Sequence, residues 1–178
     1  GKLATIDILP AEVNKGIVFK RIDLNQNNFI KASYDNVSST RLSTTLENNH
    51  GIKVSTVEHL LAAFYMAGID NAIVEINNEE VPIMDGSSKE FLDVLGKTHL
   101  VNQSKKRKYL KVSNKIELID GKRKISIEPN NSSLEVNFQL NYENKIIGNQ
   151  KNVVDFHNDN LDEVSSLSLI HISEPTRP

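Results

Sequence analysis

The stretch VSTVEHLLAAFYMAGIDN, residues 54–71, constrains the fold more than any other part of the sequence, because its apolar residues cover two faces of one helix. At about 100° per residue, one apolar stripe is formed by Val57, Leu60, Leu61 and Phe64. The nearly opposite face carries His59 beside Ala62, Ala63 and Met66. A helix with two apolar faces is buried on both sides. We therefore expect a layered domain in which His59 lies between two layers.

Strand patterns surround this helix. Ile6 and Ile8 alternate with polar neighbours, and the segments 16–24 (GIVFKRIDL) and 71–76 (NAIVEI) have the composition of further strands. Gly68 is placed where a glycine commonly ends a helix. Strands combined with a few helices, without regular alternation of the two, predict the α+β class.

The segment EVPIMDGSSKEFLDVLG, residues 80–96, predicts a loop, a turn at Asp85-Gly86 and a second short helix. Ser87 and Glu90 have the S-x-x-E spacing of a capping box, and Gly96 is placed to end the helix. We interpret PIMDGSS as a turn and helix start that shapes the domain, rather than as catalytic residues.

The sequence predicts a first α+β domain over residues 1–101, a polar and basic linker over 102–108, and strands of an incomplete second domain over 109–166. In the second domain, a hairpin is expected around Asp120-Gly121, with Ile116 and Leu118 facing Ile125 and Ile127. The segment LEVNFQLNY alternates cleanly, with Leu134, Val136, Phe138 and Leu140 on one face.

Composition excludes several classes of function. The net charge is −2 with 25% charged residues, so no strong field favours nucleic acid or an anionic membrane. The chain has no cysteine, so a bound metal would need histidine and carboxylate ligands. The longest apolar run, residues 60–69, is shorter than the roughly 20 residues that span a bilayer. Since no signal-peptide pattern opens the chain, we expect a cytoplasmic protein with no transmembrane segment and no obligate protein partner.

The last residues, 167–178, have no cap, turn or period that continues the fold. The stretch LSLIHISEPTR resembles a translated sequencing-library adapter, so we interpret 167–178 as a non-native tail joined to a truncated reading frame, in preference to the alternative of a genuine disordered tail. His171 then carries no functional weight. On this interpretation the natural gene continues differently after Ser166, and because the chain opens without Met, further sequence is also expected upstream.

Glu58 and His59, adjacent at the start of the apolar helix, allow two interpretations. Ser55 and Glu58 have capping-box spacing, which would make Glu58 a helix cap and His59 a packing residue. Alternatively, His59 ligates a metal and Glu58 is the base beside it. The remaining histidines, His50, His99 and His157, show no H-x₃-H spacing, so further ligands would have to come from elsewhere.

Several segments together resemble a known family, the UDP-3-O-acyl-N-acetylglucosamine deacetylases, which are zinc amidohydrolases of lipid A biosynthesis. The resemblance is most specific in VSTVEHLLAAFYMAGIDNAIVEINNEEVPIMDGSSKEF, residues 54–91. It extends in order through PAEVNKGIVFKRIDL, IKASYDNVSSTRLSTTL and IIGNQ (residues 146–150), and covers residues 1 to about 166.

The resemblance implies two similar sheet-plus-helix domains packed as a sandwich, with the second incomplete in this chain. It implies Zn²⁺ as cofactor, His59 as one zinc ligand and Glu58 as general base. The substrate implied is a UDP-linked acylated N-acetylglucosamine, from which acetate is released. Leu42 and Ser43 match positions near the substrate, although many relatives carry Cys where this chain has Ser43.

In the family, the other zinc ligands form a His-x-x-x-Asp on a second-domain helix, and a further His is the general acid. None of these has a counterpart in this chain. We therefore expect the 178-residue chain itself to be inactive. Two alternatives remain open: a non-catalytic α+β binding module with Glu58 as helix cap, and another metallohydrolase on the same scaffold.

Overall fold

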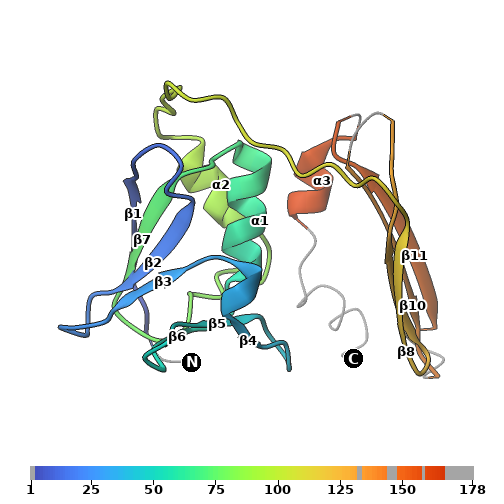
Figure 1. Cartoon of the computed structure of the whole chain (residues 1–178), viewed down its shortest axis with the longest axis horizontal. Coiled ribbons are helices and arrows are strands. Elements are labelled where there is room, and N and C mark those ends of the chain that lie inside the picture. Colours follow the sequence, from blue (N-terminus) through green and yellow to red (C-terminus); the bar gives the residue numbers. More distant parts are fainter. Residues whose placement is uncertain (1–2, 132–133, 144–147, 158, 167–178) are drawn as a thin grey trace, which may run out of the picture. The chain divides into compact units, whose positions relative to one another are not determined.

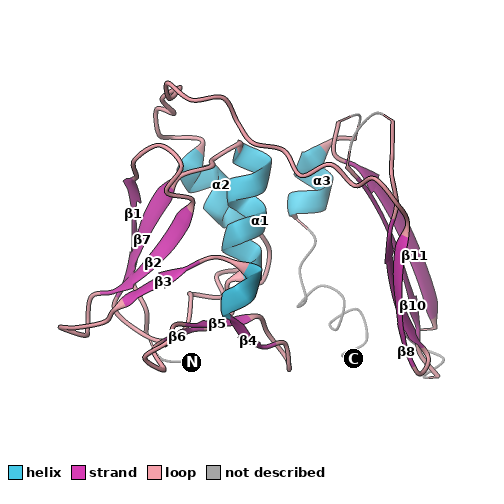
Figure 2. Cartoon of the chain, in the orientation of Figure 1, coloured by secondary structure: helices cyan, strands magenta, loops and turns pink. Residues whose placement is uncertain are grey.

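The computed structural model describes residues 3–131, 134–143, 148–157 and 159–166, and it confirms the α+β class (Figures 1 and 2). The chain divides into two compact units, which are described separately below. Unit 1 comprises residues 1–107 with 165–178, and unit 2 comprises residues 108–164.

A four-stranded sheet forms the base of unit 1, with the strand order β1-β7-β2-β3. β7 lies between β1 and β2 in this sheet, and it pairs antiparallel with β1 and parallel with β2. The sequence segments predicted as strands are all present. The strands of this sheet are β1 (Ile6–Pro10), β2 (Ile17–Arg21), β3 (Phe29–Lys31) and β7 (Ala72–Ile76).

Helices α1 (Glu58–Ala67) and α2 (Lys89–Leu95) lie on one side of this sheet (Figure 1). The strand register places Ile8, Val74, Phe19 and Ile30 in one row across all four strands. This row packs into a core that also contains fully buried residues of α1, including Leu60 and Phe64. Burial of this apolar surface is what holds the helices on the sheet.

A small three-stranded sheet, in the order β4-β5-β6, leads into the first helix. The loop between β4 and β5 carries residues 40–44, and β6 ends directly before the residues that open α1. Both segments therefore reach the start of the helix. The elements are a 3₁₀ turn (Tyr34–Asn36), β4 (Val37–Ser39), β5 (Thr45–Glu47) and β6 (Lys53–Val54).

Both helices end at the glycines expected from the sequence. Gly68 closes α1 in the left-handed conformation, with φ +73°, whereas Gly96 follows α2 with an ordinary φ of −64°. At the start of α2 the hydroxyl of Ser87 accepts the N–H of Lys89 at 3.1 Å. Ser87 thus satisfies a free amide of the helix start, although the N-cap position itself belongs to Ser88.

The segment 102–108, predicted as a linker, is tied to unit 1 by side-chain hydrogen bonds. Gln103 donates to the carbonyl of Ala11 at 2.8 Å, and Arg107 donates to Asp70 at 2.8 Å. The boundary between the two units falls directly after Arg107.

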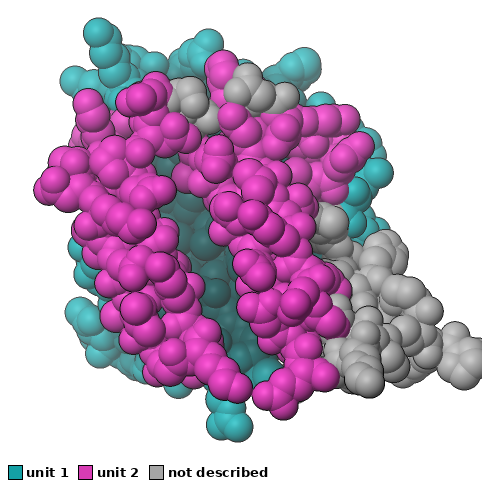
Figure 3. Space-filling model, turned by 90° about the vertical axis from the view of Figure 1, so that its right-hand side faces the viewer, with its two compact units in different colours: residues 1–107, 165–178 teal, residues 108–164 magenta. Residues whose placement is uncertain are grey.

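The described residues of unit 2, the magenta unit in Figure 3, form two separate two-stranded sheets. The hairpin register is as expected, with Ile116 opposite Ile127 and Leu118 opposite Ile125. The turn lies one residue later than predicted, because Asp120 still pairs with Arg123. The strands are β8 (Ile116–Asp120), β9 (Arg123–Ile127), β10 (Glu135–Asn141) and β11 (Asn149–Asp155), and a short helix α3 (Leu161–Ser165) follows.

Two further predictions concern residues that the structure does not describe. The interpretation of residues 167–178 as a non-native tail lies outside the described residues, as does the first part of the segment 146–150. Among the described residues, no helix combines the length and the apolarity that crossing a membrane requires.

Candidate active site

Helix α1 begins at Glu58 without a side-chain cap. Val57 occupies the N-cap position and makes no side-chain cap bond. Ser55, the predicted N-cap, lies outside the helix in a parallel bridge with Glu80, and its hydroxyl donates to the carbonyl of Glu79 at 3.3 Å. The capping-box interpretation of Ser55 and Glu58 is therefore wrong, because Ser55 pairs as a strand residue and the chain enters the helix later.

The Glu58 carboxylate instead reaches across to the loop between β4 and β5. Its Oε2 accepts the backbone N–H of Thr44 at 3.0 Å. The preceding residue is also linked to this loop, since the N–H of Val57 donates to the carbonyl of Thr44 at 3.4 Å. These two bonds fix the start of α1 against the loop that contains Ser43.

Two residues of the site have left-handed backbone conformations. Thr56 has φ +58° and Leu42 has φ +72°. This region costs an L-residue about 1–2 kcal/mol, and a β-branched residue such as threonine adopts it only rarely. Conformations of this kind cluster at functional sites, where the surrounding structure holds them.

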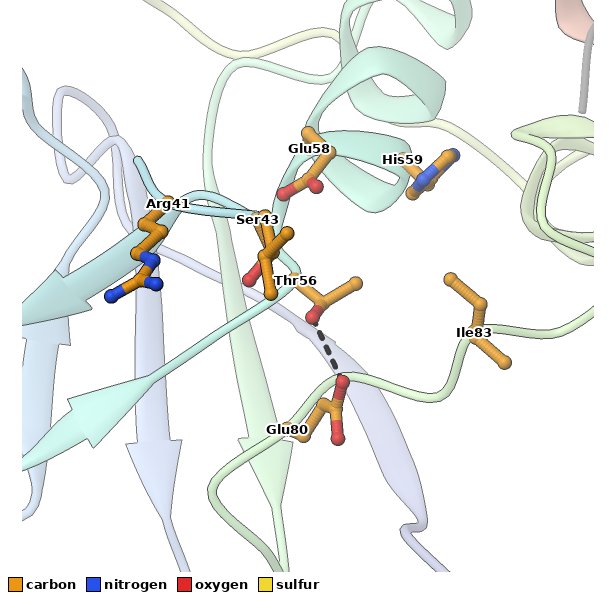
Figure 4. Close-up of a pocket in the computed structure, with 8 residues that line it drawn as sticks. Arg41, Ser43, Thr56, Glu58, His59, Glu80 and Ile83 are labelled. Atoms are coloured by element: carbon orange, nitrogen blue, oxygen red, sulfur yellow. Dashed lines mark hydrogen bonds between the residues drawn. The ribbon is translucent and has the colours of Figure 1, made fainter. Parts of the chain in front are cut away.

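The four residues predicted from the sequence as site residues, Leu42, Ser43, Glu58 and His59, lie together around one cavity (Figure 4). The cavity has a volume of about 380 Å³. Four further residues also line it: Arg41, Thr56, Glu80 and Ile83.

The further lining residues were not identified from the sequence. Arg41 directly precedes Leu42, and Thr56 lies inside the T-V-E-H motif, so adjacency to predicted site residues was the available signal. Ile83 lies in the segment PIMDGSS, interpreted from its sequence as a turn and helix start, and nothing local marks Glu80. They reach the cavity only because the segment after β7 pairs with Ser55.

Figure 4 shows the Glu58 carboxylate turned toward Ser43 and Thr56, whereas the His59 ring lies apart from them. This divergence follows from the helix, in which successive side chains project about 100° apart. Consecutive residues at the start of α1 therefore present a carboxylate and an imidazole to different parts of one cavity.

The Nε2 atom of His59 is buried and has no hydrogen-bond partner within the described part of the chain. Buried polar atoms without a partner are uncommon in folded proteins and call for an explanation. An unprotonated imidazole nitrogen is a common metal ligand. His59 could thus provide one ligand of a metal site.

A complete metal site is not formed by this chain's described residues, where no group of three His, Cys, Asp or Glu side chains is placed to hold an ion. His50, His99 and His157 are exposed and do not line the cavity. Among the residues that line the cavity, the side chains able to bind a metal ion through a nitrogen or a carboxylate oxygen are His59, Glu58 and Glu80.

A comparison with protein families identifies the family of this chain. The model of the UDP-3-O-acyl N-acetylglycosamine deacetylase (LpxC) family matches residues 1–166. The chain belongs to this family. Membership agrees with the resemblance expected from the T-V-E-H and P-I-M-D-G-S segments, and both segments contribute residues to the cavity of this LpxC-family chain.

Curated proteins named UDP-3-O-acyl-N-acetylglucosamine deacetylase are similar to the chain at about 40% identity. The protein of Geotalea uraniireducens (strain Rf4) is 42% identical over 156 residues, which are 88% of this chain and 50% of that protein. The protein of Geobacter sp. (strain M21) is 40% identical with the same coverage. That of Shewanella sp. (strain ANA-3) is 38% identical over 155 residues, 86% of this chain and 50% of that protein.

The chain therefore spans about half the length of the curated LpxC-family relatives that it matches.

Proposed function

We propose that the complete protein hydrolyses the N-acetyl group of UDP-3-O-acyl-N-acetylglucosamine in lipid A biosynthesis, releasing acetate and a free amine. The single observation that carries this proposal is the placement of Glu58 and His59 at consecutive helix positions in one cavity, in a chain of the deacetylase family. The cavity also contains Leu42 and Ser43, which the family resemblance associates with the substrate.

We propose Zn²⁺ as the cofactor, with His59 as one of its ligands. The buried Nε2 without a hydrogen-bond partner supports this assignment. When bound, zinc would lower the pKa of water and polarise the amide carbonyl of the substrate. The remaining ligands would come from residues other than those described here.

Glu58 is proposed as the general base. The N–H of Thr44 donates to Oε2, which fixes the carboxylate and leaves Oε1 to accept a proton. Glu58 would take this proton from the attacking water as the oxygen adds to the amide carbonyl carbon.

Leu42 and Ser43 are proposed to contact the substrate. The Leu42 side chain is 98% exposed, although it lines the cavity, so it offers apolar surface to a bound molecule at no cost in its own packing. Ser43 is half-buried and supplies a hydroxyl that can donate or accept a hydrogen bond.

The proposal is tested by comparing Glu58→Gln with His59→Ala in the complete protein. We expect Glu58→Gln to keep its zinc and to lose about 10²–10⁴-fold in kcat, the range of general acid–base catalysis. We expect His59→Ala to lose zinc affinity as well as activity. Zinc content by mass spectrometry and acetate release are the measurements. Glu90→Gln, at an exposed position in the first turn of α2, is the matched control and should match the parent. Turnover retained in Glu58→Gln would exclude Glu58 as the base.

The alternatives are separated by other outcomes of the same work. If the protein were a non-catalytic binding module, neither substitution would change the amount of acetate released. If it were another metallohydrolase, the complete protein would bind zinc but would not hydrolyse this substrate. We expect the 178-residue chain alone to release no acetate, since its described residues lack a group of three metal ligands. Reading the source locus beyond the codon for Ser166 would show whether a His-x-x-x-Asp helix follows.

A further inference from the structure

The start of α1 depends on one residue, Thr56, that is held between two segments of unit 1. On one side, the preceding Ser55 pairs by its backbone with the segment after β7: its N–H donates to the carbonyl of Glu79 at 2.8 Å and its carbonyl accepts the N–H of Val81 at 3.1 Å. On the other side, the following Val57 donates to Thr44. The chain must turn between these two anchors.

The turn is made by the left-handed conformation of Thr56, at φ +58°. Threonine is a poor residue for this conformation, so something must hold it there. The side chain supplies the restraint: Oγ1 of Thr56 donates to Oε1 of Glu80 at 3.0 Å (Figure 4, dashed line). Thr56 is 7% exposed, and water therefore replaces this bond only poorly.

Glu80 is an exposed residue, whose carboxylate would be hydrated if Thr56 were absent. Its carboxylate lies at the wall of the same cavity as Glu58 and His59. A hydrogen bond that restrains a strained residue next to two site residues points to a role in their placement.

We propose that Glu80 is a positioning residue for the Glu58–His59 pair. By accepting the Thr56 hydroxyl, it holds the turn from which α1 begins, and the turn sets the direction in which the first two side chains of the helix project. The expected effect on turnover rests on the proposed function. The expected effect on the placement of Glu58 rests only on the hydrogen bond between Thr56 and Glu80. It assigns the role to the accepting oxygen of Glu80, and not to its charge.

The test uses four variants of the complete protein. Glu80→Ala and Thr56→Val remove the bond, the second at nearly constant side-chain volume, whereas Glu80→Gln and Thr56→Ser keep an acceptor and a donor. We expect the first pair to lower kcat about 10–100-fold with KM within twofold of the parent, because a small misplacement of a catalytic group has effects of this size. We expect Glu80→Gln and Thr56→Ser to keep kcat within threefold of the parent value. The double variant Thr56→Val/Glu80→Ala should lose no more than either single variant.

A second measurement is independent of activity. The N–H of Thr44 donates to Glu58, so its hydrogen-exchange rate, measured by NMR, reports whether that carboxylate is in place. It should rise at least tenfold in Glu80→Ala and Thr56→Val and stay at the parental value in Glu80→Gln. If the unmodified complete protein releases no acetate, the proposed function fails while this rate still decides the positioning role.

The inference would be overturned if Glu80→Ala kept both the kcat of the parent and its hydrogen-exchange rate at Thr44. It would also be overturned if Glu80→Ala and Glu80→Gln lost equal amounts of kcat. Should Glu80→Ala not fold, Thr56→Val and Thr56→Ser decide alone, since they alter the same bond from the buried side.

Discussion

Arg21 is a cation that lies almost entirely inside unit 1, with 8% of its surface exposed. Its guanidinium donates two hydrogen bonds to Asp23, at 2.8 and 2.6 Å, and one to the carbonyl of Lys53 at 2.8 Å. The residue thereby connects β2 to β6, the strand that leads into the site. The hydrogen bonds from Arg21 hold the pKa of the Asp23 carboxyl below its ordinary value, and those to Asp23 raise the pKa of Arg21.

This pair predicts a loss of stability in acid. Because the pKa of Asp23 is lower in the folded than in the unfolded chain, its contribution is fully present above the unfolded value, near 4, and disappears as the pH falls through the lower folded value. We expect Asp23→Asn to lower the free energy of unfolding by about 1 kcal/mol at pH 7. The parent and the variant should converge below pH 3. Urea unfolding followed by circular dichroism at pH 7, 5 and 3 measures this, with Asp7→Asn, an exposed carboxylate on β1, as control. A constant difference at all three pH values would contradict the assignment.

At the scale of single elements, helix α1 ends as its sequence predicts, and the reason is local. Gly68 adopts φ +73°, and the N–H of Ile69 reaches back to the carbonyl of Phe64 at 2.9 Å. This is the closing pattern of a helix that ends at a left-handed glycine. A Cβ at Gly68 would meet only the Arg107 guanidinium, at 3.5 Å, so the backbone conformation rather than space decides what substitutions do.

We therefore expect Gly68→Ala to lower the free energy of unfolding by about 1–2 kcal/mol, the cost of a left-handed L-residue. Gly68→Asn should cost clearly less, although its side chain is larger, because asparagine tolerates this conformation better. Urea unfolding of the two variants at pH 7 provides the comparison. An asparagine variant as unstable as the alanine variant would indicate a clash instead.

Local patterns explain which elements were predictable. The two helices, the strand β7 and the pairing of Leu118 with Ile125 follow from periodicity and turn residues in single segments of the chain. The capping-box interpretation, one of the two left open for the start of α1, was wrong because it rested on local sequence alone: Ser55 has cap-like spacing, but a bridge to Glu80 holds it outside the helix. The left-handed Thr56 likewise depends on partners more than 20 residues away, which no local pattern reveals. The catalytic and zinc-binding roles of Glu58 and His59 stay predictions.

At the scale of the whole molecule, the two units differ in how they bury apolar residues. The core cluster consists entirely of residues of unit 1. In the described part of unit 2, Val154 is the only buried apolar residue, and paired side chains such as Leu118 and Ile125 are 67% and 69% exposed. An isolated two-stranded hairpin is at best marginally stable in water. The described strands of unit 2 are thus paired by hydrogen bonds without a core of buried apolar residues.

This difference predicts unequal protection in the 178-residue chain. Amides of β2 and β7 should exchange slowly, because they open only with the core of unit 1, whereas those of β8 and β9 should exchange almost as fast as in an unfolded peptide. Hydrogen-exchange mass spectrometry with peptides from both units makes the measurement. Amides of the small sheet β4-β5-β6, within unit 1, provide an intermediate reference. Protection of β8 and β9 equal to that of β7 would show that unit 2 has a stable core.

The central place of β7 has a consequence for biosynthesis. Ile6 of β1 pairs with Ile76 of β7, about 70 positions later, so β1 leaves the ribosome long before its partner is translated. At roughly 5–20 residues per second, the nascent strand remains an open edge for ~4–14 s. Such an edge is a template for association with other chains. Chaperone binding to the emerging β1 segment would therefore protect the chain during the time in which this strand lacks its partner.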